Sequence, residues 1–379
     1  MNDQEAMRQA LACARGVEGR TSPRPPVGAV VVRNGVITGQ GATAPPYGPH
    51  AETQALEQAG MTAYGSTLYT TLEPCCIQRH TPPCTAAIIA AGVHRVVVGV
   101  LDPNPHVYEQ GIAQLRGAGI DVTLLDDCPE ALEARELIRP FECAVTRARP
   151  YVTAKWAMTL DGKLASSTGD ASWISQPDAR SWVHDLRDRV DAIVVGARTA
   201  RIDNPHLTVR LASGQQRWAR TARLTSPLRV IVATSGDLPE HLAVLQPELA
   251  GGTCVLTGET CASTSRQRLA ARGAEVLTVA VNSCGQVDLP AALHALRQRG
   301  IVHILLEGGA RLLGSAFDDG CIDHVAAFVA PKLVGGSCAP SPLAGQGLMK
   351  MTQACQLLNV RTTFFETDIL IEGDMPDGR

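Results

Sequence analysis

The residues best suited to bind a metal or to take part in catalysis lie in two short segments, His50-Ala51-Glu52 and Pro74-Cys75, and at Cys84. One imidazole and two thiolates suit zinc and leave a fourth tetrahedral position for water, as catalytic zinc sites require. Bound zinc lowers the pKa of such a water to about 7. Residues two apart on a helix do not share a face, so Glu52 is poorly placed to bind the same ion as His50. The pattern favours a hydrolytic zinc centre in which Glu52 moves protons.

Other interpretations of these cysteines stay open. A fourth protein ligand would close the site into a structural one, and His80 suits that role better than Cys76, which directly follows Cys75. Zinc deaminases combine H-x-E with P-C-x-x-C, whereas eight residues separate Cys75 from Cys84 here. A disulfide is the weakest interpretation, because the 12 cysteines are scattered along the chain without the spacing of a small disulfide-stabilised domain.

Hydrophobic patterning around these residues alternates between strands and helices. The β-branched run from Val27 to Val32 meets a second strand across Asn34-Gly35, a dipeptide typical of tight hairpins. A helix opens at His50, residues Ser66 to Leu72 have strand character, and prolines before Cys84 indicate the start of another helix. The first part of the chain is therefore expected to be a layered α/β domain.

A second alternation of strands and helices follows a helical connector between Pro129 and Val145. Its expected strands have the sequences DAIVVG, LRVIVAT, TCVLTG, AEVLTVA and IVHILLE. We expect an α/β fold with two domains, residues 1–146 and 147–379, and a boundary error of several residues.

Composition excludes several classes of protein. The chain has 379 residues, of which 45% are hydrophobic and 19% charged, so it can bury large cores. Lys+Arg 34 against Asp+Glu 37 gives no basic excess for nucleic acid or an anionic membrane. We find neither a secretory signal pattern nor an apolar run long enough to span a bilayer. These features favour a soluble cytoplasmic protein that acts on small molecules.

The segments GAVVV, HAE, TLEPC, TPPC, AAGV and DPNP resemble the deaminase half of the bifunctional riboflavin-biosynthesis deaminase/reductase family. The resemblance continues through the second half and implies a cytidine-deaminase-like domain followed by a dihydrofolate-reductase-like one. It implies that His50, Cys75 and Cys84 bind zinc and that Glu52 is the catalytic proton shuttle. The implied reaction hydrolyses the exocyclic 2-amino group of a diaminopyrimidinone ribosylamino 5′-phosphate and releases ammonia.

The segments TAKWAMTLDGKLAS, GDASWIS, VVGARTARIDNPHLTVR and LLEGGARLLGSAF are similar to the reductase half of the same family. The resemblance implies hydride transfer from NADPH to C1 of the ribosylamino group, and homo-oligomers formed through this domain. No G-x-G-x-x-G follows a strand, but Gly308-Gly309 before a helix can hold a phosphate on its backbone N–H groups. The implied cofactor contacts are Ala157, Trp173, Thr199, Asp203, Thr234, Gly308 and Gly309. The expected substrate contacts are Lys155, Arg187, Leu207, Arg210 and Glu307.

The chain departs from the family pattern around both expected pockets. Arg24, Thr43, Ile77 and His80 replace residues that usually line the deaminase pocket, which suggests Arg24 as a new phosphate contact. In the reductase half, Thr234 replaces a serine and keeps its hydroxyl, and Ala171 replaces a substrate-binding serine, a loss of about 1 kcal/mol of binding. The alternative function is a reductase whose first domain is a weak or inactive zinc module.

Overall fold

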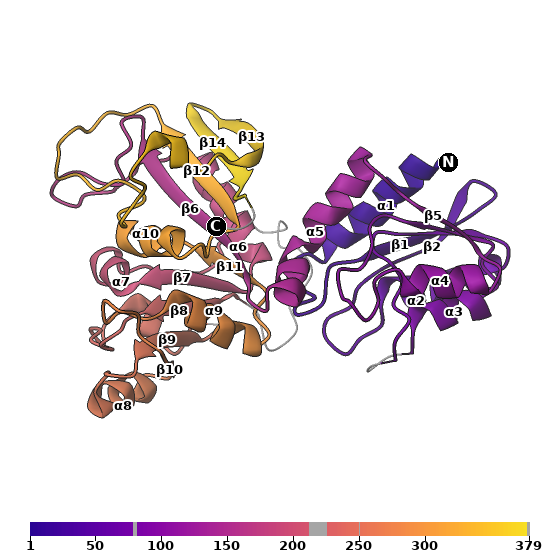
Figure 1. Ribbon diagram of the computed structural model, residues 1–379, viewed down its shortest axis with the longest axis horizontal. Coiled ribbons are helices and arrows are strands. Elements are labelled where there is room, and N and C mark those ends of the chain that lie inside the picture. Colours follow the sequence, from indigo (N-terminus) through magenta and orange to yellow (C-terminus); the bar gives the residue numbers. More distant parts are fainter. Residues whose placement is uncertain (79–81, 212–225, 250, 377–379) are drawn as a thin grey trace. The chain divides into compact units, whose positions relative to one another are not determined.

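The computed structural model describes residues 1–78, 82–211, 226–249 and 251–376 (Figure 1). The chain divides into two compact units, one formed by Met1–Ala148 and the other beginning at Arg149. Each unit is an α/β structure with a sheet of its own. Among the described residues, we find no helix with the length and apolar character needed to cross a membrane.

The first unit contains a five-stranded sheet with the order β2-β1-β3-β4-β5. β1 runs antiparallel to β2 and β3, and β3, β4 and β5 run parallel. The strands are β1 (Gly28–Arg33), β2 (Val36–Ala42), β3 (Thr67–Thr70), β4 (Arg95–Val98) and β5 (Asp121–Leu124). The β1–β2 hairpin turns at Asn34 and Gly35, both at positive φ, which confirms the sequence prediction.

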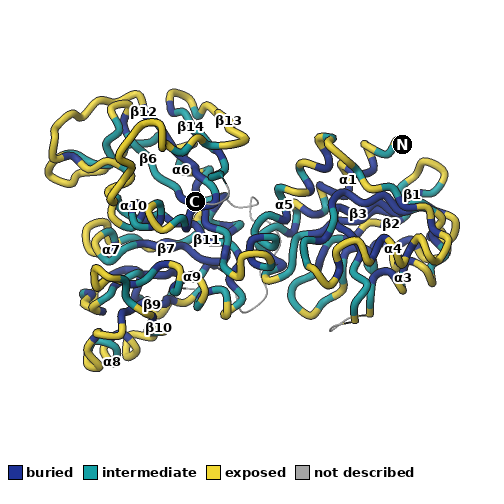
Figure 2. Tube along the Cα trace, in the orientation of Figure 1, coloured by how far each residue is buried: buried dark blue, intermediate teal, exposed yellow. Residues whose placement is uncertain are grey.

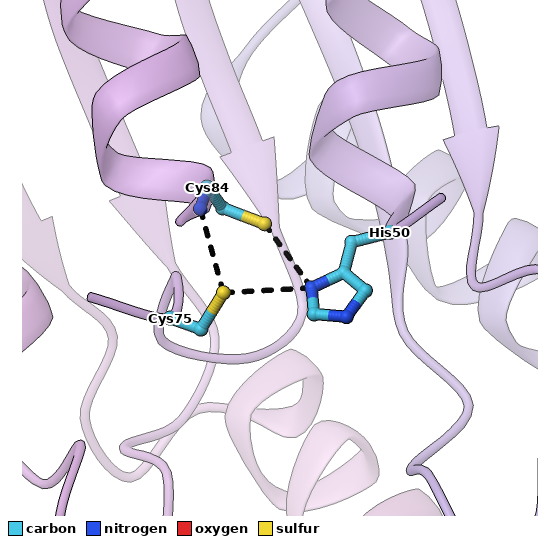
Figure 3. Close-up of side chains that lie close together, drawn as sticks. All are labelled: His50, Cys75 and Cys84. Atoms are coloured by element: carbon cyan, nitrogen blue, oxygen red, sulfur yellow. Dashed lines mark hydrogen bonds between the residues drawn. The ribbon is translucent and has the colours of Figure 1, made fainter. Parts of the chain in front are cut away.

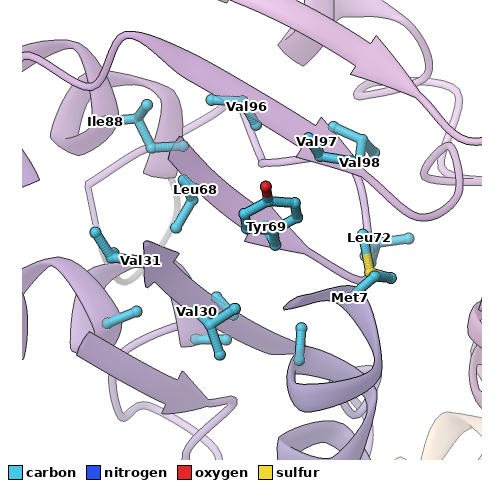
Figure 4. Packing of buried hydrophobic residues seen from close by; sticks show 14 of the residues in the cluster. Met7, Val30, Val31, Leu68, Tyr69, Leu72, Ile88, Val96, Val97 and Val98 are labelled. Carbon is cyan, nitrogen blue, oxygen red and sulfur yellow. The ribbon is translucent and has the colours of Figure 1, made fainter. Parts of the chain in front are cut away.

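Helices cover both faces of this sheet (Figure 1). They are α1 (Asp3–Gly16), α2 (Ala51–Ala59), the short 3-10 helix η1 (Gly60–Ala63), α3 (Cys84–Ala90), α4 (Gln110–Gly117) and α5 (Pro129–Thr146). α1 packs beside α5, and α3 contacts both α2 and α4. Because helices lie on both faces, residues 28–32 of β1 are all buried, as the dark trace in Figure 2 shows. Val31, Leu68 and Val96 are register partners on neighbouring strands, and Figure 4 shows them among the buried residues of this core.

Two glycines of β2 let α2 lie directly against the sheet. A Cβ added at Gly39 would lie 2.1 Å from the carbonyl oxygen of Ala55, and one at Gly41 would lie 2.3 Å from that of Ala51. No side chain fits at such distances, so the small residues of both elements fix how closely the helix approaches. This contact sets the position of the N-terminus of α2, where His50 is the N-cap residue.

The second unit contains a nine-stranded sheet with the order β10-β9-β8-β7-β11-β6-β12-β14-β13. Its strands are parallel except β14 and β13, which are added antiparallel at one edge. The strands are β6 (Tyr151–Thr159), β7 (Ala192–Gly196), β8 (Leu228–Val232), β9 (Thr253–Gly258), β10 (Glu275–Val279), β11 (His303–Leu306), β12 (His324–Ala330), β13 (Leu358–Phe365) and β14 (Asp368–Asp374). The sequence patterns located β7 to β11, whereas β12, β13 and β14 were not among the expected strands.

The helices of the second unit connect the parallel strands. They are α6 (Pro177–Arg189), α7 (Ala197–Asp203), α8 (Ser263–Ala271), α9 (Leu289–Gln298) and α10 (Ala310–Asp318), with 3-10 helices η2 (Ala243–Leu245) and η3 (Met351–Gln353). α7 directly follows β7, and α10 follows β11 after a short turn. The carboxyl ends of these parallel strands therefore meet at one edge, the usual location of binding sites in such sheets.

Candidate active sites

His50, Cys75 and Cys84 come together from three different elements of the first unit (Figure 3). His50 is the N-cap of α2, Cys75 follows β3, and Cys84 is the first residue of α3. One ligand atom from each lies within 4.8 Å of the others. His50 Nδ1 is 3.2 Å from Cys84 Sγ and 3.5 Å from Cys75 Sγ. A tetrahedral zinc ion would hold N and S donors about 3.5 Å apart, so this donor set fits zinc.

The two thiols of this cluster differ in acidity. A hydrogen bond from the Cys84 thiol, together with the nearby His50, lowers the pKa of Cys75 to about 4. The same hydrogen bond and burial raise the pKa of Cys84. The backbone N–H of Cys84, at the start of α3, also points to Cys75 Sγ at 3.4 Å. This environment favours a thiolate at Cys75, and the thiolate is the form that binds metal.

Glu52 lies in the first turn of α2 and is only 4% exposed. Burial, and then the charge of Cys75, raise its pKa to about 7. Glu52 is not a member of the ligand cluster. It lines the same cavity as His50 and Cys75. A carboxyl group in this position can exchange a proton with a molecule held beside the cluster.

The cavity beside the cluster has a volume of about 340 Å³. Three of the four departures from the family pattern line it, namely Arg24, Thr43 and Ile77. His80, the candidate fourth ligand, lies outside the described residues. Thr43 is buried, and its hydroxyl accepts a hydrogen bond from the backbone N–H of Val27 at 3.1 Å. The hydroxyl group of Thr43 therefore binds the protein backbone.

The guanidinium group of Arg24 binds the loop that leads to His50. It donates hydrogen bonds to the carbonyl oxygens of Ala44, Pro45 and Gly48, the last at 2.9 Å. The sequence suggested that Arg24 contacts a phosphate, but in this structure its terminal nitrogens bind backbone carbonyl oxygens instead. Both terminal nitrogens donate hydrogen bonds to the loop of residues 44–48.

A much larger pocket of about 1470 Å³ lies in the second unit. Almost all residues expected to bind substrate or cofactor line it, namely Lys155, Ala157, Trp173, Arg187, Thr199, Asp203, Arg210, Thr234, Glu307, Gly308 and Gly309. Leu207 is the exception, because its side chain is 3% exposed and belongs to the hydrophobic core. Any contact between Leu207 and a ligand would have to use its backbone. Ala171 also lines the pocket.

An ion pair between Arg187 and Glu307 occupies the interior of this pocket. Two hydrogen bonds of 2.6 Å join the guanidinium and the carboxylate, in a bidentate arrangement. Burial opposes ionisation of Glu307, but the charge and hydrogen bonds of Arg187, together with the charge of Lys155, outweigh it and lower the pKa of the carboxyl group. Burial lowers the pKa of the nearby Lys155. Lys155, Arg187 and Glu307 therefore form a charged cluster that lines the pocket.

His184 is a pocket residue that the sequence did not single out. It lies on α6, and its Nδ1 accepts a hydrogen bond from the backbone N–H of Arg210 at 3.2 Å. Burial, followed by the positive charges of Arg187 and Arg210, lowers its pKa to about 4. No motif surrounds it, so only its proximity to the arginines in the fold identifies it.

The turn between β11 and α10 has the predicted strand-Gly-Gly-helix form. Gly309 is the N-cap of α10, and its N–H donates to Thr199 Oγ1 at 3.0 Å. A Cβ at Gly309 would lie 2.7 Å from that same oxygen. A residue with a Cβ at this position would therefore have to displace the Thr199 hydroxyl. The two predicted cofactor contacts thus form one continuous surface.

Comparisons with known proteins cover nearly the whole chain. The family profile of the RibD C-terminal domain matches residues 150–370, and that of the cytidine and deoxycytidylate deaminase zinc-binding region matches residues 1–100. The riboflavin biosynthesis protein RibD of Synechocystis sp. is 39% identical over 98% of this chain and 96% of its own. That of Escherichia coli is 35% identical over 94% and 95%.

Solved structures give the same assignment. Acinetobacter baumannii RibD has a TM-score of 0.82 and 32% identity, and covers 99% of each chain. A Thermotoga maritima deaminase/reductase has a TM-score of 0.80 and 32% identity, and covers 98% of each chain. Matches to both halves disfavour a reductase with a merely structural first domain. The chain therefore belongs to the RibD family and is a bifunctional riboflavin-biosynthesis enzyme, with a zinc-binding deaminase domain followed by a reductase domain.

Proposed function

We propose that the first unit hydrolyses the exocyclic 2-amino group of 2,5-diamino-6-ribosylamino-4(3H)-pyrimidinone 5′-phosphate and that the second unit reduces the ribosyl side chain of the product with NADPH. The observation that carries the proposal is the cluster of His50, Cys75 and Cys84 beside a buried carboxyl group in one cavity. The Thermotoga maritima neighbour is described as a diaminohydroxyphosphoribosylaminopyrimidine deaminase and 5-amino-6-(5-phosphoribosylamino)uracil reductase. Its similarity over both halves supports this choice of substrates.

In the deaminase half, we assign the three clustered residues as ligands of zinc. A bound zinc ion supplies a Lewis acid that makes water a nucleophile at neutral pH. Glu52 takes the proton of the attacking water and delivers it to the departing amino group. Its burial keeps bulk water from competing for these protons.

In the reductase half, Arg187, Lys155 and Glu307 orient the phosphorylated substrate. The guanidinium and ammonium groups suit its phosphate and hydroxyl oxygens, and Glu307 accepts from hydroxyl or ring N–H groups. Arg210 and the backbone of Leu207 complete this set. We assign the cofactor contacts to Ala157, Trp173, Thr199, Asp203, Thr234 and the turn at Gly308 and Gly309. NADPH supplies the hydride, and the protein supplies orientation.

A coupled assay tests both halves at once. The zinc-loaded protein is given the diaminopyrimidinone phosphate and NADPH, and ammonia release and NADPH consumption are followed together. We expect one ammonia for each NADPH consumed and no ammonia from Glu52→Ala. A wild-type rate of ammonia release no higher than that of Glu52→Ala would contradict the deaminase assignment. Consumption of NADH as efficient as that of NADPH would contradict the cofactor assignment.

We further propose that the enzyme forms a homo-oligomer through β13. This strand lies at the edge of the nine-stranded sheet. Its apolar side chains are uncovered, since Leu358 is 51%, Val360 54% and Phe364 70% exposed. Exposed apolar edge strands favour pairing with a second chain. Light scattering on size-exclusion fractions should give more than one chain per particle for the wild type and one for Phe364→Lys, and a monomeric wild type would reject the proposal.

A reducing, cytoplasmic environment is part of the same proposal. All 12 cysteines of the chain are free thiols in the structure. Free thiols at this density are typical of reducing compartments. Measuring thiols in protein taken directly from cells, by alkylation and mass spectrometry, would test this, and stable disulfides would contradict it.

A further inference from the structure

Glu73 belongs to the TLEPC segment but has no role in the chemistry described above. It lies between β3 and Cys75 and is 2% exposed. Its carboxylate accepts three backbone N–H groups. Oε2 accepts from Asp102 at 3.2 Å and from Glu109 at 3.0 Å, and Oε1 accepts from Ile112 at 3.2 Å. A buried carboxylate is stable only when such donors replace its lost hydration.

The three donors belong to a segment that forms a wall of the deaminase cavity. Asp102, Asn104 and Val107 all line that cavity. The carboxylate of Asp102 in turn accepts from the N–H of Asn104 at 2.8 Å. The other two donors, Glu109 and Ile112, lie at the start of α4. One side chain therefore holds the wall and the adjoining helix end together.

The other side of Glu73 leads directly to the ligand cluster. Cys75 is two residues further along the chain. Its carbonyl oxygen accepts from the N–H of Thr85 at 3.2 Å, and its Sγ accepts from the N–H of Cys84 at 3.4 Å. The position of Cys75 is thus restrained on one side by hydrogen bonds from the start of α3 and on the other by the bonded carboxylate of Glu73.

The packing of α4 gives independent evidence that this junction is tight. A Cβ added at Gly111 would lie 2.1 Å from the carbonyl oxygen of Pro74 and 3.2 Å from Glu73 Oε1. No side chain can occupy that space without moving α4 or the Glu73-Pro74 segment. By contrast, a Cβ at Gly117 of the same helix would meet nothing within 4 Å.

We infer that Glu73 is a positioning residue for deamination, which joins the Cys75 ligand segment to the cavity wall formed by residues 102–107. This inference rests on the proposed function of the first unit. The carboxylate of Glu73 connects the segment that contains Cys75 to residues 102–107. Weakening its hydrogen bonds should therefore change both the geometry of metal binding and the affinity for substrate. The acidic residue is required because its two oxygens only accept, whereas a glutamine presents an N–H₂ group to one of the donors.

The test uses the full-length enzyme and three variants. Glu73→Gln weakens the junction from the side of the carboxylate, and Gly111→Ala displaces α4 while keeping the carboxylate. Gly117→Ala is the matched control in the same helix. We expect kcat/KM for ammonia release to fall about 10–100-fold in the first two variants, as for other residues that orient metal ligands, with a higher KM. Gly117→Ala should keep the wild-type values, and NADPH consumption with the reductase substrate should be unchanged in all three variants.

Cobalt(II) in place of zinc gives a readout that does not depend on turnover. Absorption bands from thiolate bound to cobalt should shift in Glu73→Gln and Gly111→Ala but not in Gly117→Ala. Wild-type kcat, KM and cobalt spectrum in folded Glu73→Gln and Gly111→Ala proteins would overturn the inference, even if their melting temperatures fell. If the wild type itself released no ammonia, the proposed function would fail, and the cobalt spectra would still decide the role of Glu73.

Discussion

Glu52 in the deaminase cavity and Glu307 in the reductase pocket are both largely withdrawn from solvent, and their carboxyl groups have opposite acidities. Among the described residues, no cationic side chain is hydrogen-bonded to Glu52, and burial raises its pKa to about 7. Glu307 in the reductase pocket is bonded twice to Arg187, and its pKa is lowered despite burial. The neighbouring charge decides the protonation state, since burial is common to both. The carboxyl group of Glu52 can therefore exchange a proton near neutral pH, whereas that of Glu307 keeps its negative charge.

The pockets also differ in how the chain builds them. The deaminase cluster uses three residues between His50 and Cys84, namely the N-cap of α2, a residue of the loop after β3, and the first residue of α3. The reductase pocket collects residues from Lys155 to Pro340, many of them at the carboxyl ends of parallel strands. Metal chemistry needs a few donors at fixed distances, which short motifs can supply. Hydride transfer from a large cofactor needs an extended surface, which only a whole domain can supply.

The largest expected effect is the complete loss of one activity while the other is retained. Cys84→Ser removes one of the three proposed zinc ligands, so we expect loss of bound zinc and of ammonia release, whereas NADPH consumption with the already deaminated substrate should be retained. Metal analysis and the two activities check this. Cys13→Ser is the control, because Cys13 lies in α1 of the same unit and outside the ligand cluster. Loss of reductase activity in Cys84→Ser would show that the pockets do not operate independently.

Removing the charge of Glu307 should affect only the second pocket. Glu307→Gln leaves Arg187 largely withdrawn from solvent and without its ionic partner, which costs about 3 kcal/mol in such pairs. We expect unfolding of the second unit at lower denaturant concentration and a reductase kcat/KM about 100-fold lower, with ammonia release unchanged. An unaltered reductase kcat/KM would mean that the ion pair serves stability alone.

A substitution of Arg24 tests whether this residue contacts the substrate phosphate or stabilises the loop that lines the cavity. Arg24→Asn restores the residue usual in the family and removes the hydrogen bonds to the loop carbonyls. We expect the deaminase KM to rise about fivefold, equivalent to about 1 kcal/mol, by the same factor for substrate with and without its phosphate. Hydrogen exchange at residues 43–49 should also be faster. A rise confined to the phosphorylated substrate would restore the phosphate role.

The smallest expected effect concerns a single hydroxyl group in the reductase pocket. Ala171→Ser restores the family serine at a position that lines the pocket. One added hydrogen bond contributes about 1 kcal/mol, so we expect the reductase KM for substrate to fall about fivefold. A KM equal to the wild-type value would mean that the substrate does not reach this position.

The sequence by itself identified the one histidine and two cysteines that lie together in the first unit, and the order of most elements. His50, Cys75 and Cys84 flank strong local signals, such as the strand before Glu73 and the prolines before α3. Element ends are fixed by short-range preferences, so residues placed there can be located without knowledge of the fold. The glycine turn before α10 was predictable for the same reason.

Only the tertiary structure decided the partners of individual side chains. Whether Arg24 contacts a phosphate or the Ala44 carbonyl depends on where two distant loops meet. The pairing of Arg187 with Glu307 joins residues that are 120 positions apart. The burial of Leu207 likewise depends on packing between elements, which no local pattern records. Hydrogen bonds and charge pairs act over a few ångströms, so their partners are set by the folded chain and not by neighbours in sequence.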